Sequence, residues 1–372
     1  MGTDRMRIFL CGDVMLGRGV DQVLPSPCSP ELHENYVRSA VDYVRLAERA
    51  NGPIPAPVDL PYVWGAALEE LERRQPDARI INLETSITRS GDFESKGINY
   101  RMSPENAAVL AAACIDCCVL ANNHVLDWGR SGLLDTLRTL DGLNIKHAGA
   151  GRDAVTAREP AVLDRGAKGR VLVLAMASIT SGVPPDWAAL PGGAGVNLLP
   201  DFSEATAGEI GAAIAEARRP NDIVIASIHW GPNWGYKVVD EQRRFAHALI
   251  DRAQVSIVHG HSSHHAKAIE VHRERLILHG CGDFLNDYEG IAGYEEYRGD
   301  LTLMYFPEVD CSTGRVVALD LVPLQIRRFR LHRASTEGAD WLMRTLDRES
   351  RRYGAGIVRS QGESLKLVFA PS

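Results

Sequence analysis

Short runs of consecutive apolar residues alternate along the chain with segments in which apolar residues recur at helical spacing. The runs predict strands at 7–11, 78–83, 115–120, 171–177, 223–228, 255–258 and 276–278. The segments between them predict helices at 61–74, 132–140, 203–219 and 240–252. Strands that are apolar throughout are buried on both faces, so the alternation predicts an α/β fold whose sheets are covered by helices.

Two parts of the chain depart from this alternation. A proline-rich stretch at 24–61 predicts a surface insertion, bounded at about 21–61, within a main domain of residues 1–330. Such a segment either covers a site as a lid or is passive, and the sequence leaves both open. Strands at 301–306 and 316–329 follow, and residues 331–372 predict a C-terminal helix and strand that pack on the same domain.

Most of the predicted strands end in a polar side chain that can bind a ligand. These residues are Asp13, Glu84, Asn123, His229, His261 and Asp283. In α/β sheets, ligands bind beyond the carboxyl ends of the strands. Scattered polar residues would not repeatedly choose that position, so the pattern predicts one composite site.

Histidines are concentrated near one of these strand ends, since six of the twelve lie between His259 and His279. Imidazoles crowded after a buried strand indicate metal ligands or proton-transfer groups. Together with the oxygen ligands they form a mixed set that suits Mn, Fe, Co or Zn better than Ca or Mg. Its members are Asp13, Glu84, Asn123, His229, His261 and His264. One or two such ions would activate a water and clamp a phosphoryl or carbonyl oxygen.

Other residues near these positions are candidates for catalysis and substrate binding. His124 follows a candidate ligand and is placed to act as general acid for a leaving group; the alternative is a supporting or helix-capping histidine. Arg18, just after the first strand, either binds an anionic group or lies on a solvated surface. Asn122 and Trp230 each adjoin an expected ligand and are the further candidate substrate contacts.

Composition narrows the class of protein. The net charge of -7, without a basic stripe, argues against nucleic acid as a partner. No apolar run approaches the roughly 18 residues that span a bilayer, and the N-terminus lacks the apolar stretch of a signal peptide. The seven cysteines are odd in number and lie mostly in apolar runs, as free core cysteines do. We therefore expect a cytoplasmic protein without an integral membrane segment.

The order of the motifs resembles the CapA (poly-γ-glutamate capsule biosynthesis) family, which is similar to the calcineurin-like metallophosphoesterases. The motifs that carry the resemblance lie at 12–18, 82–84, 121–129, 229–231 and 260–264. It implies a calcineurin-like metallophosphatase fold, a β-sandwich of mixed sheets flanked by helices. It also implies His124 as the catalytic histidine and metal-type positions at Asp13, Glu84, Asn123, His229, His261 and His264.

The sequence departs from the phosphoesterase pattern at two positions and from the capsule proteins at one feature. Met15 stands where the first motif of the phosphoesterases has a histidine, and Glu84 stands in place of their bridging aspartate. Loss of an imidazole weakens the first metal position, so we expect one ion, two, or none. The capsule proteins commonly carry an N-terminal membrane anchor, for which this sequence has no apolar segment.

Three functions remain open. The first is a metal-dependent hydrolase of an anionic small molecule, phosphoester or γ-glutamyl or peptide polymer, linked to poly-γ-glutamate or capsule biosynthesis. The second, which the resemblance implies because proteins similar to this family include a peptide epimerase, is a metal-independent epimerase in which Asp13 and His264 exchange protons on opposite faces of a Cα centre. The third is a non-catalytic accessory protein in polymer assembly. The sequence does not give the substrate or the oligomeric state.

Overall fold

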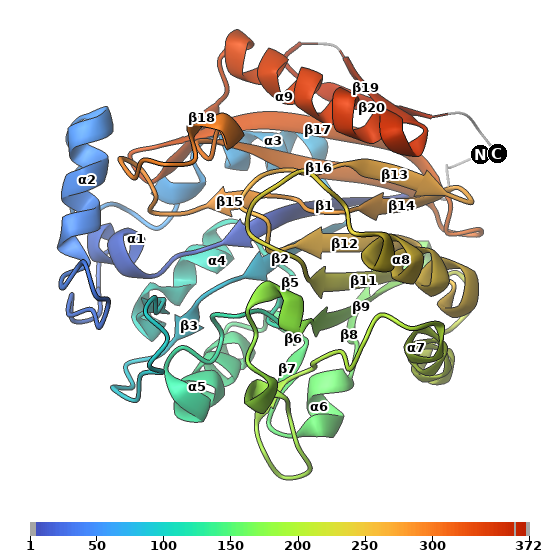
Figure 1. The fold of residues 1–372 in the computed structure, drawn as a ribbon, viewed down its shortest axis with the longest axis horizontal. Coiled ribbons are helices and arrows are strands. Elements are labelled where there is room, and N and C mark those ends of the chain that lie inside the picture. Colours follow the sequence, from blue (N-terminus) through green and yellow to red (C-terminus); the bar gives the residue numbers. More distant parts are fainter. Residues whose placement is uncertain (1–4, 361, 370–372) are drawn as a thin grey trace.

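The computed structural model describes residues 5–360 and 362–369, which form two mixed sheets packed face to face and flanked by helices (Figure 1). The larger sheet has the order β19 (Ala355–Arg359), β20 (Leu365–Phe369), β17 (Val316–Arg327), β16 (Leu301–Asp310), β1 (Arg5–Val14), β2 (Ala78–Leu83), β5 (Cys117–Val119), β6 (Lys146–Ala148), with β15 (Asp283–Leu285) on β1 and β18 (Arg330–Arg333) on β17. The smaller has the order β13 (Ile269–His272), β14 (Arg275–Leu278), β12 (Ile257–His261), β11 (Ile223–His229), β9 (Arg170–Ala177), β8 (Ala161–Asp164).

Helices and two small ribbons surround the two sheets (Figure 1). The ribbons pair β3 (Ser86–Ile87) with β4 (Arg101–Met102), and β7 (Ala150–Gly151) with β10 (Gly195–Val196). The helices are α1 (Arg18–Val23), α2 (Val41–Asn51), α3 (Ala66–Arg74), α4 (Ala108–Ala112), α5 (Gly129–Gly142), α6 (Ala154–Arg158), α7 (Glu204–Ala217), α8 (Asp240–Ala253) and α9 (Thr336–Ser350). Among the described residues, no helix is both long and apolar enough to cross a membrane.

The continuous apolar runs are explained by burial on both faces of the smaller sheet. In β9, Val171 and Val173 belong to the core between the two sheets, while Leu172 and Leu174 belong to the core under α7 and α8. Successive side chains of a strand point to opposite faces, so a strand between two cores is apolar on both faces except where it enters the site. The predicted α/β architecture of mixed sheets flanked by helices is confirmed.

β1 lies at the centre of the larger sheet and positions the site. It pairs in parallel with β2 and β15 and antiparallel with β16. A Cβ atom on Gly12 would lie 1.6 Å from the carbonyl oxygen of Gly282, so only glycine lets β15 come this close. The resulting register sets Asp13 opposite Asp283 on one side and Asn82 on the other.

The predicted 24–61 segment and the C-terminal extension both pack on this framework. The segment contains α2 and a small apolar cluster of Leu32, Ala40 and Tyr43. α9 packs against β19, and β19 and β20 extend the larger sheet. The single strand expected at 316–329 is divided, because Arg328 and Phe329 adopt positive φ angles of 55° and 53° and turn the chain into β18.

Candidate functional site

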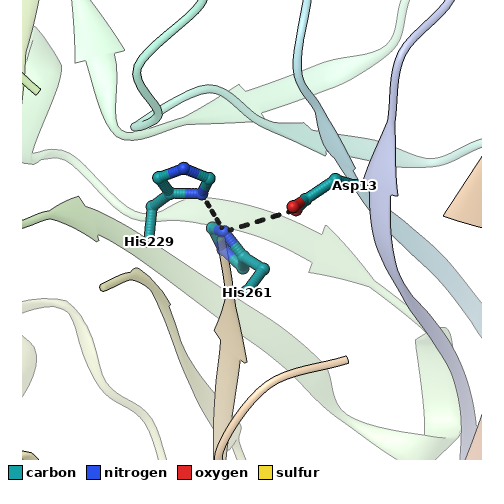
Figure 2. Close-up of side chains that lie close together, drawn as sticks. All are labelled: Asp13, His229 and His261. Atoms are coloured by element: carbon teal, nitrogen blue, oxygen red, sulfur yellow. Dashed lines mark hydrogen bonds and ion pairs between the residues drawn. The ribbon is translucent and has the colours of Figure 1, made fainter. Parts of the chain in front are cut away.

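The polar residues expected at the strand ends converge where the two sheets meet. Asp13 comes from β1, while His229 and His261 end the neighbouring strands β11 and β12 of the other sheet. Nδ1 of His261 lies 3.9 Å from Oδ1 of Asp13 and 2.7 Å from Nδ1 of His229, and all three side chains are buried (Figure 2). One atom of each lies within 4.8 Å of the others, which is close enough for a shared cation.

A chain of hydrogen bonds sets the tautomer of His261. Burial lowers the pKa of His259 to about 4, so its ring is neutral, and its Nε2–H donates to the carbonyl oxygen of Cys11 at 2.8 Å. Nδ1 of His259 then accepts from the Ser227 hydroxyl, 3.0 Å away. The Ser227 oxygen in turn accepts the Nε2–H of His261 at 2.9 Å. His261 therefore keeps a lone pair on Nδ1, the atom facing Asp13, as a metal ligand requires.

Glu84 and Asn123 lie beside this group. Oε1 of Glu84 is 3.9 Å from Nε2 of His229, and the Asn123 Oδ1 is 2.9 Å from the same nitrogen. The side-chain amide of Asn82 joins the carboxylates, donating to Asp13 at 2.7 Å and to Glu84 at 3.4 Å. All the expected metal positions of the first group are thus brought together.

A second group shares Asp13 with the first. Asp13, His264 and Asp283 each have one atom within 4.8 Å of the others. Nδ1 of His264 lies 2.8 Å from Oδ1 of Asp283, and Asn286 donates to the other oxygen of that carboxylate at 2.7 Å. The backbone N–H of Ser262, a residue strained at φ 95°, donates to Oδ2 of Asp13 at 3.3 Å.

His124 has the partners of a proton-transfer group. Its Nδ1 lies 2.6 Å from Oδ2 of Asp127, and its Nε2 lies 3.8 Å from Oε1 of Glu84. Lys96 donates to Oδ1 of Asp127 at 2.7 Å and also contacts the carbonyl oxygen of Asn123. Burial lowers the pKa of His124 to about 4. At neutral pH its Nε2 therefore carries a lone pair, which suits a proton acceptor better than the general acid expected from sequence.

The electrostatics of the centre favour a cation. Burial and the neighbouring Asp283 carboxylate raise the pKa of Asp13 to about 7, and burial and Asp13 raise the pKa of Glu84. Burial lowers the pKa of His229 and of His261 well below the usual value, so both rings are neutral. Three carboxylates lie in the centre, those of Asp13, Glu84 and Asp283. In the part of the chain that the structure describes, their ion-pair partners are histidines, and none is a lysine or arginine. Crowded carboxylates beside neutral imidazoles fit a divalent transition metal.

A cleft of about 660 Å³ opens beside the second group. His264 lies in its wall, next to Trp234, whose ring stacks on Tyr294 with centroids 4.0 Å apart. Tyr36 and Asn51, both within the predicted insertion, line the same cleft. The insertion therefore borders the candidate substrate space.

Arg18, Asn122 and Trp230, the three candidate substrate contacts, lie in different surroundings within the protein. Arg18 is only 3% exposed and forms ion pairs with Glu34 at 2.9 Å and with Asp287, so it is not a solvated surface residue. Asn122 is buried, and its side chain bonds to Asn82 and to the backbone around it. Trp230 packs in the core under α7 and α8 and donates to a backbone carbonyl at 3.1 Å. The placement of Trp230 gives no support to a substrate contact.

Three residues of the site were not among the candidate metal ligands or catalytic groups. Asp283 was noted as a polar residue that ends an apolar run, and its place after Gly282 was the available signal. Asp127 follows His124 by three residues in the 121–129 motif, a spacing that lets a turn bring the two together. Lys96 lies in a loop without periodicity, and no sequence signal pointed to it.

Fold and site together define a two-sheet α/β protein with a mixed nitrogen and oxygen centre where the sheets meet. Residues 7–288 match the family model described as "Bacterial capsule synthesis protein PGA_cap". The chain therefore belongs to this family, and the CapA resemblance of its motifs is confirmed.

Relatives span most of the chain. A protein described as "Probable polyglutamine synthesis accessory protein" from Mycobacterium tuberculosis (strain ATCC 25618 / H37Rv) is 47% identical over 369 residues, covering 99% of this chain and 97% of that protein. The PGA biosynthesis protein CapA of Bacillus subtilis (strain 168) is 28% identical, covering 87% of this chain and 72% of that protein. A solved structure described as a novel phosphatase from Mycoplasma pneumoniae aligns with a TM-score of 0.48 at 13% identity, covering 87% of this chain and 94% of that one.

Proposed function

We propose that this protein is a metal-dependent hydrolase of an anionic substrate, a phosphoester or a γ-glutamyl bond, that acts in the synthesis of a poly-γ-glutamate or capsule polymer. The observation that carries the proposal is the pair of ligand groups that share Asp13, with buried carboxylates that have no lysine or arginine partner among the described residues. The printed names of the relatives, which refer to polyglutamine and PGA synthesis, support the link to polymer synthesis.

In this proposal, one group of residues holds the metal and the neighbouring cleft holds the substrate. Asp13, His229 and His261, with Glu84 and Asn123 beside them, would hold the metal. When bound, the metal supplies a Lewis acid that lowers the pKa of a water and polarises an oxygen of the substrate. The cleft beside His264 would hold the part of the substrate that does not react.

His124 would move the proton in this reaction. Its Nδ1–H donates to Asp127, which leaves Nε2 free to take up a proton on the side of Glu84. Asp127 would stabilise the imidazolium that forms, and His124 could then give the proton to the leaving group. Lys96 holds Asp127 in place for this role.

The metal content of protein purified without a histidine tag or chelator tests the proposal. We expect about one or two equivalents of Mn, Fe, Co or Zn in the wild type and a marked loss of metal in His229→Ala. The control is His147→Ala, which changes a histidine that pairs with Asp141 and belongs to neither ligand group, and its metal content should equal that of the wild type. Loaded protein should hydrolyse phosphoester or γ-glutamyl amide model substrates and lose this activity on chelation. Protein that stays empty after reconstitution with each of the four metals would refute the proposal.

A metal-independent peptide epimerase is the second candidate function. It is favoured by the contact of His264 with Asp283 opposite the Asp13 carboxylate, which gives two proton-transfer groups in one small space. Burial opposes protonation of His264, but the Asp283 carboxylate raises its pKa. This function predicts solvent deuterium at a peptide Cα with metal-free protein, and loss of the exchange in Asp13→Asn. A non-catalytic accessory role would instead leave polymer synthesis in cells unchanged by that substitution.

A further inference from the structure

Asp283 occupies a position that the sequence motifs do not assign. It begins β15, and the parallel register sets it opposite Asp13 on β1. Its side chain is 2% exposed, and it contacts His264 at 2.8 Å and Asn286 at 2.7 Å. A carboxylate this deeply buried, facing a second carboxylate, is stabilised by a proton bound to the pair or by positive charge nearby.

The residue two positions after Asp13 cannot supply a nitrogen ligand, because it is Met15. Met15 is fully buried, and its thioether sulfur lies 3.6 Å from the hydroxyl of Tyr288. A thioether is a soft ligand that contributes little to binding of Mn²⁺ or Zn²⁺ among carboxylates. A cation next to Asp13 on this side must therefore take its ligands from another strand.

We infer that Asp283 and His264 form a second cation site, and that Asp13 is the ligand shared with the site of His229 and His261. The inference rests on the proposed function, because it requires that the centre binds metal. Two observations carry it: the three ligand atoms lie within 4.8 Å of one another, and the tight approach of Gly12 to Gly282 holds β15 in this register. Asp283 thereby replaces in space the ligand that Met15 cannot provide.

Hydrogen bonds distinguish the two ring nitrogens of His264. The side-chain amide of Asn233 lies 3.0 Å from Nε2, on the cleft side of the ring. Because the amide donates to Nε2, Nδ1 faces the carboxylates and carries the hydrogen that Oδ1 of Asp283 accepts, and a bound cation would take the place of that hydrogen. In two-metal sites that share a ligand the ions lie roughly 3.5–4 Å apart, so two bound Mn²⁺ ions would be magnetically coupled.

The test is a titration of metal-free full-length protein with Mn²⁺, with bound ions counted after desalting and the EPR spectrum recorded at one and two equivalents. We expect two ions with a coupled spectrum in the wild type, and one uncoupled ion in Asp283→Asn and in His229→Ala. Asp251→Asn, which changes an aspartate paired with His272 outside the site, should behave as wild type. If Asp283→Asn does not fold, as judged by circular dichroism, His264→Ala tests the same site.

The outcomes separate this inference from the proposed function. Two coupled ions in Asp283→Asn would overturn the inference. One ion in the wild type that is lost in His229→Ala but unaffected in Asp283→Asn would also overturn it, and would leave the metal-dependent hydrolase standing. No ion in the wild type would overturn both.

Discussion

Replacement of Arg18 tests whether this residue holds the fold or binds substrate. Its guanidinium donates to Asp287 at 2.5 and 3.1 Å and to Glu34 at 2.9 Å. It also lies over the rings of Tyr43 and Tyr100, 3.9 and 4.4 Å from their centroids. Because Glu34 and Tyr43 belong to the 24–61 segment, Arg18 joins that segment to the chain that follows β15.

The structure gives the size of the effect. Arg18→Met keeps most of the side-chain volume but leaves two fully buried carboxylates without their cation, since Asp287 and Glu34 are both 0% exposed. Removal of one partner from a buried ion pair costs about 3–5 kcal/mol in free energy of unfolding. An exposed pair contributes only about 0–1 kcal/mol, so Arg45→Met, which breaks the surface pair with Asp42, is the matched control.

Urea unfolding followed by circular dichroism measures both variants, and Arg18→Met/Asp287→Asn completes a double-mutant cycle. We expect the double variant to lose less than the sum of the two single losses, because the second change removes a charge already left unpaired. Limited proteolysis should cut the 24–61 segment faster in Arg18→Met than in wild type. A loss below about 1 kcal/mol, with weakened substrate binding, would refute the structural role and favour the anion-binding role.

Three further predictions concern other residues. The positive charge of Lys96 lowers the pKa of His124, and Lys96 also pairs with Asp127. Lys96→Met removes both effects, so the acid limb of the pH profile of kcat/KM should move to higher pH. An unmoved acid limb would exclude Lys96 from the proton-transfer group. Burial lowers the pKa of His259 to about 4 from about 6.5 when unfolded. The free energy of unfolding should therefore fall by about 3 kcal/mol as the pH is lowered from about 6.5 to about 4, because the unfolded state binds the proton first. In thermal unfolding, His259→Gln should make stability depend less on pH over this range. Trp230→Phe should cost about 1–3 kcal/mol by leaving a buried carbonyl unpaired, with metal content unchanged; altered KM without lost stability would restore it as a substrate contact.

The sequence by itself determined the sheets and the edge at which the site forms. Apolar runs such as 171–177 and 223–228 became β9 and β11 because a strand between two cores must be apolar on both faces. Parallel strands bring their carboxyl ends to the same edge, so the polar residues that end them meet whatever the loops do. His229 and His261 were predictable as neighbours for this reason, whereas Asp13 meets them because the two sheets pack together at these edges.

Tertiary structure alone decided the partners of these residues. Asp283 joins Asp13 through a three-residue strand too short for any periodic signal, and its position depends on the backbone contact of Gly12 with Gly282. The local sequence left Arg18 as either an anion-binding or a surface residue, but its ion pair with Asp287, 269 residues away, is buried. The burial and ion pairing of Arg18 and Asp283 arise from contacts between segments far apart in the sequence, and local sequence patterns do not predict such contacts.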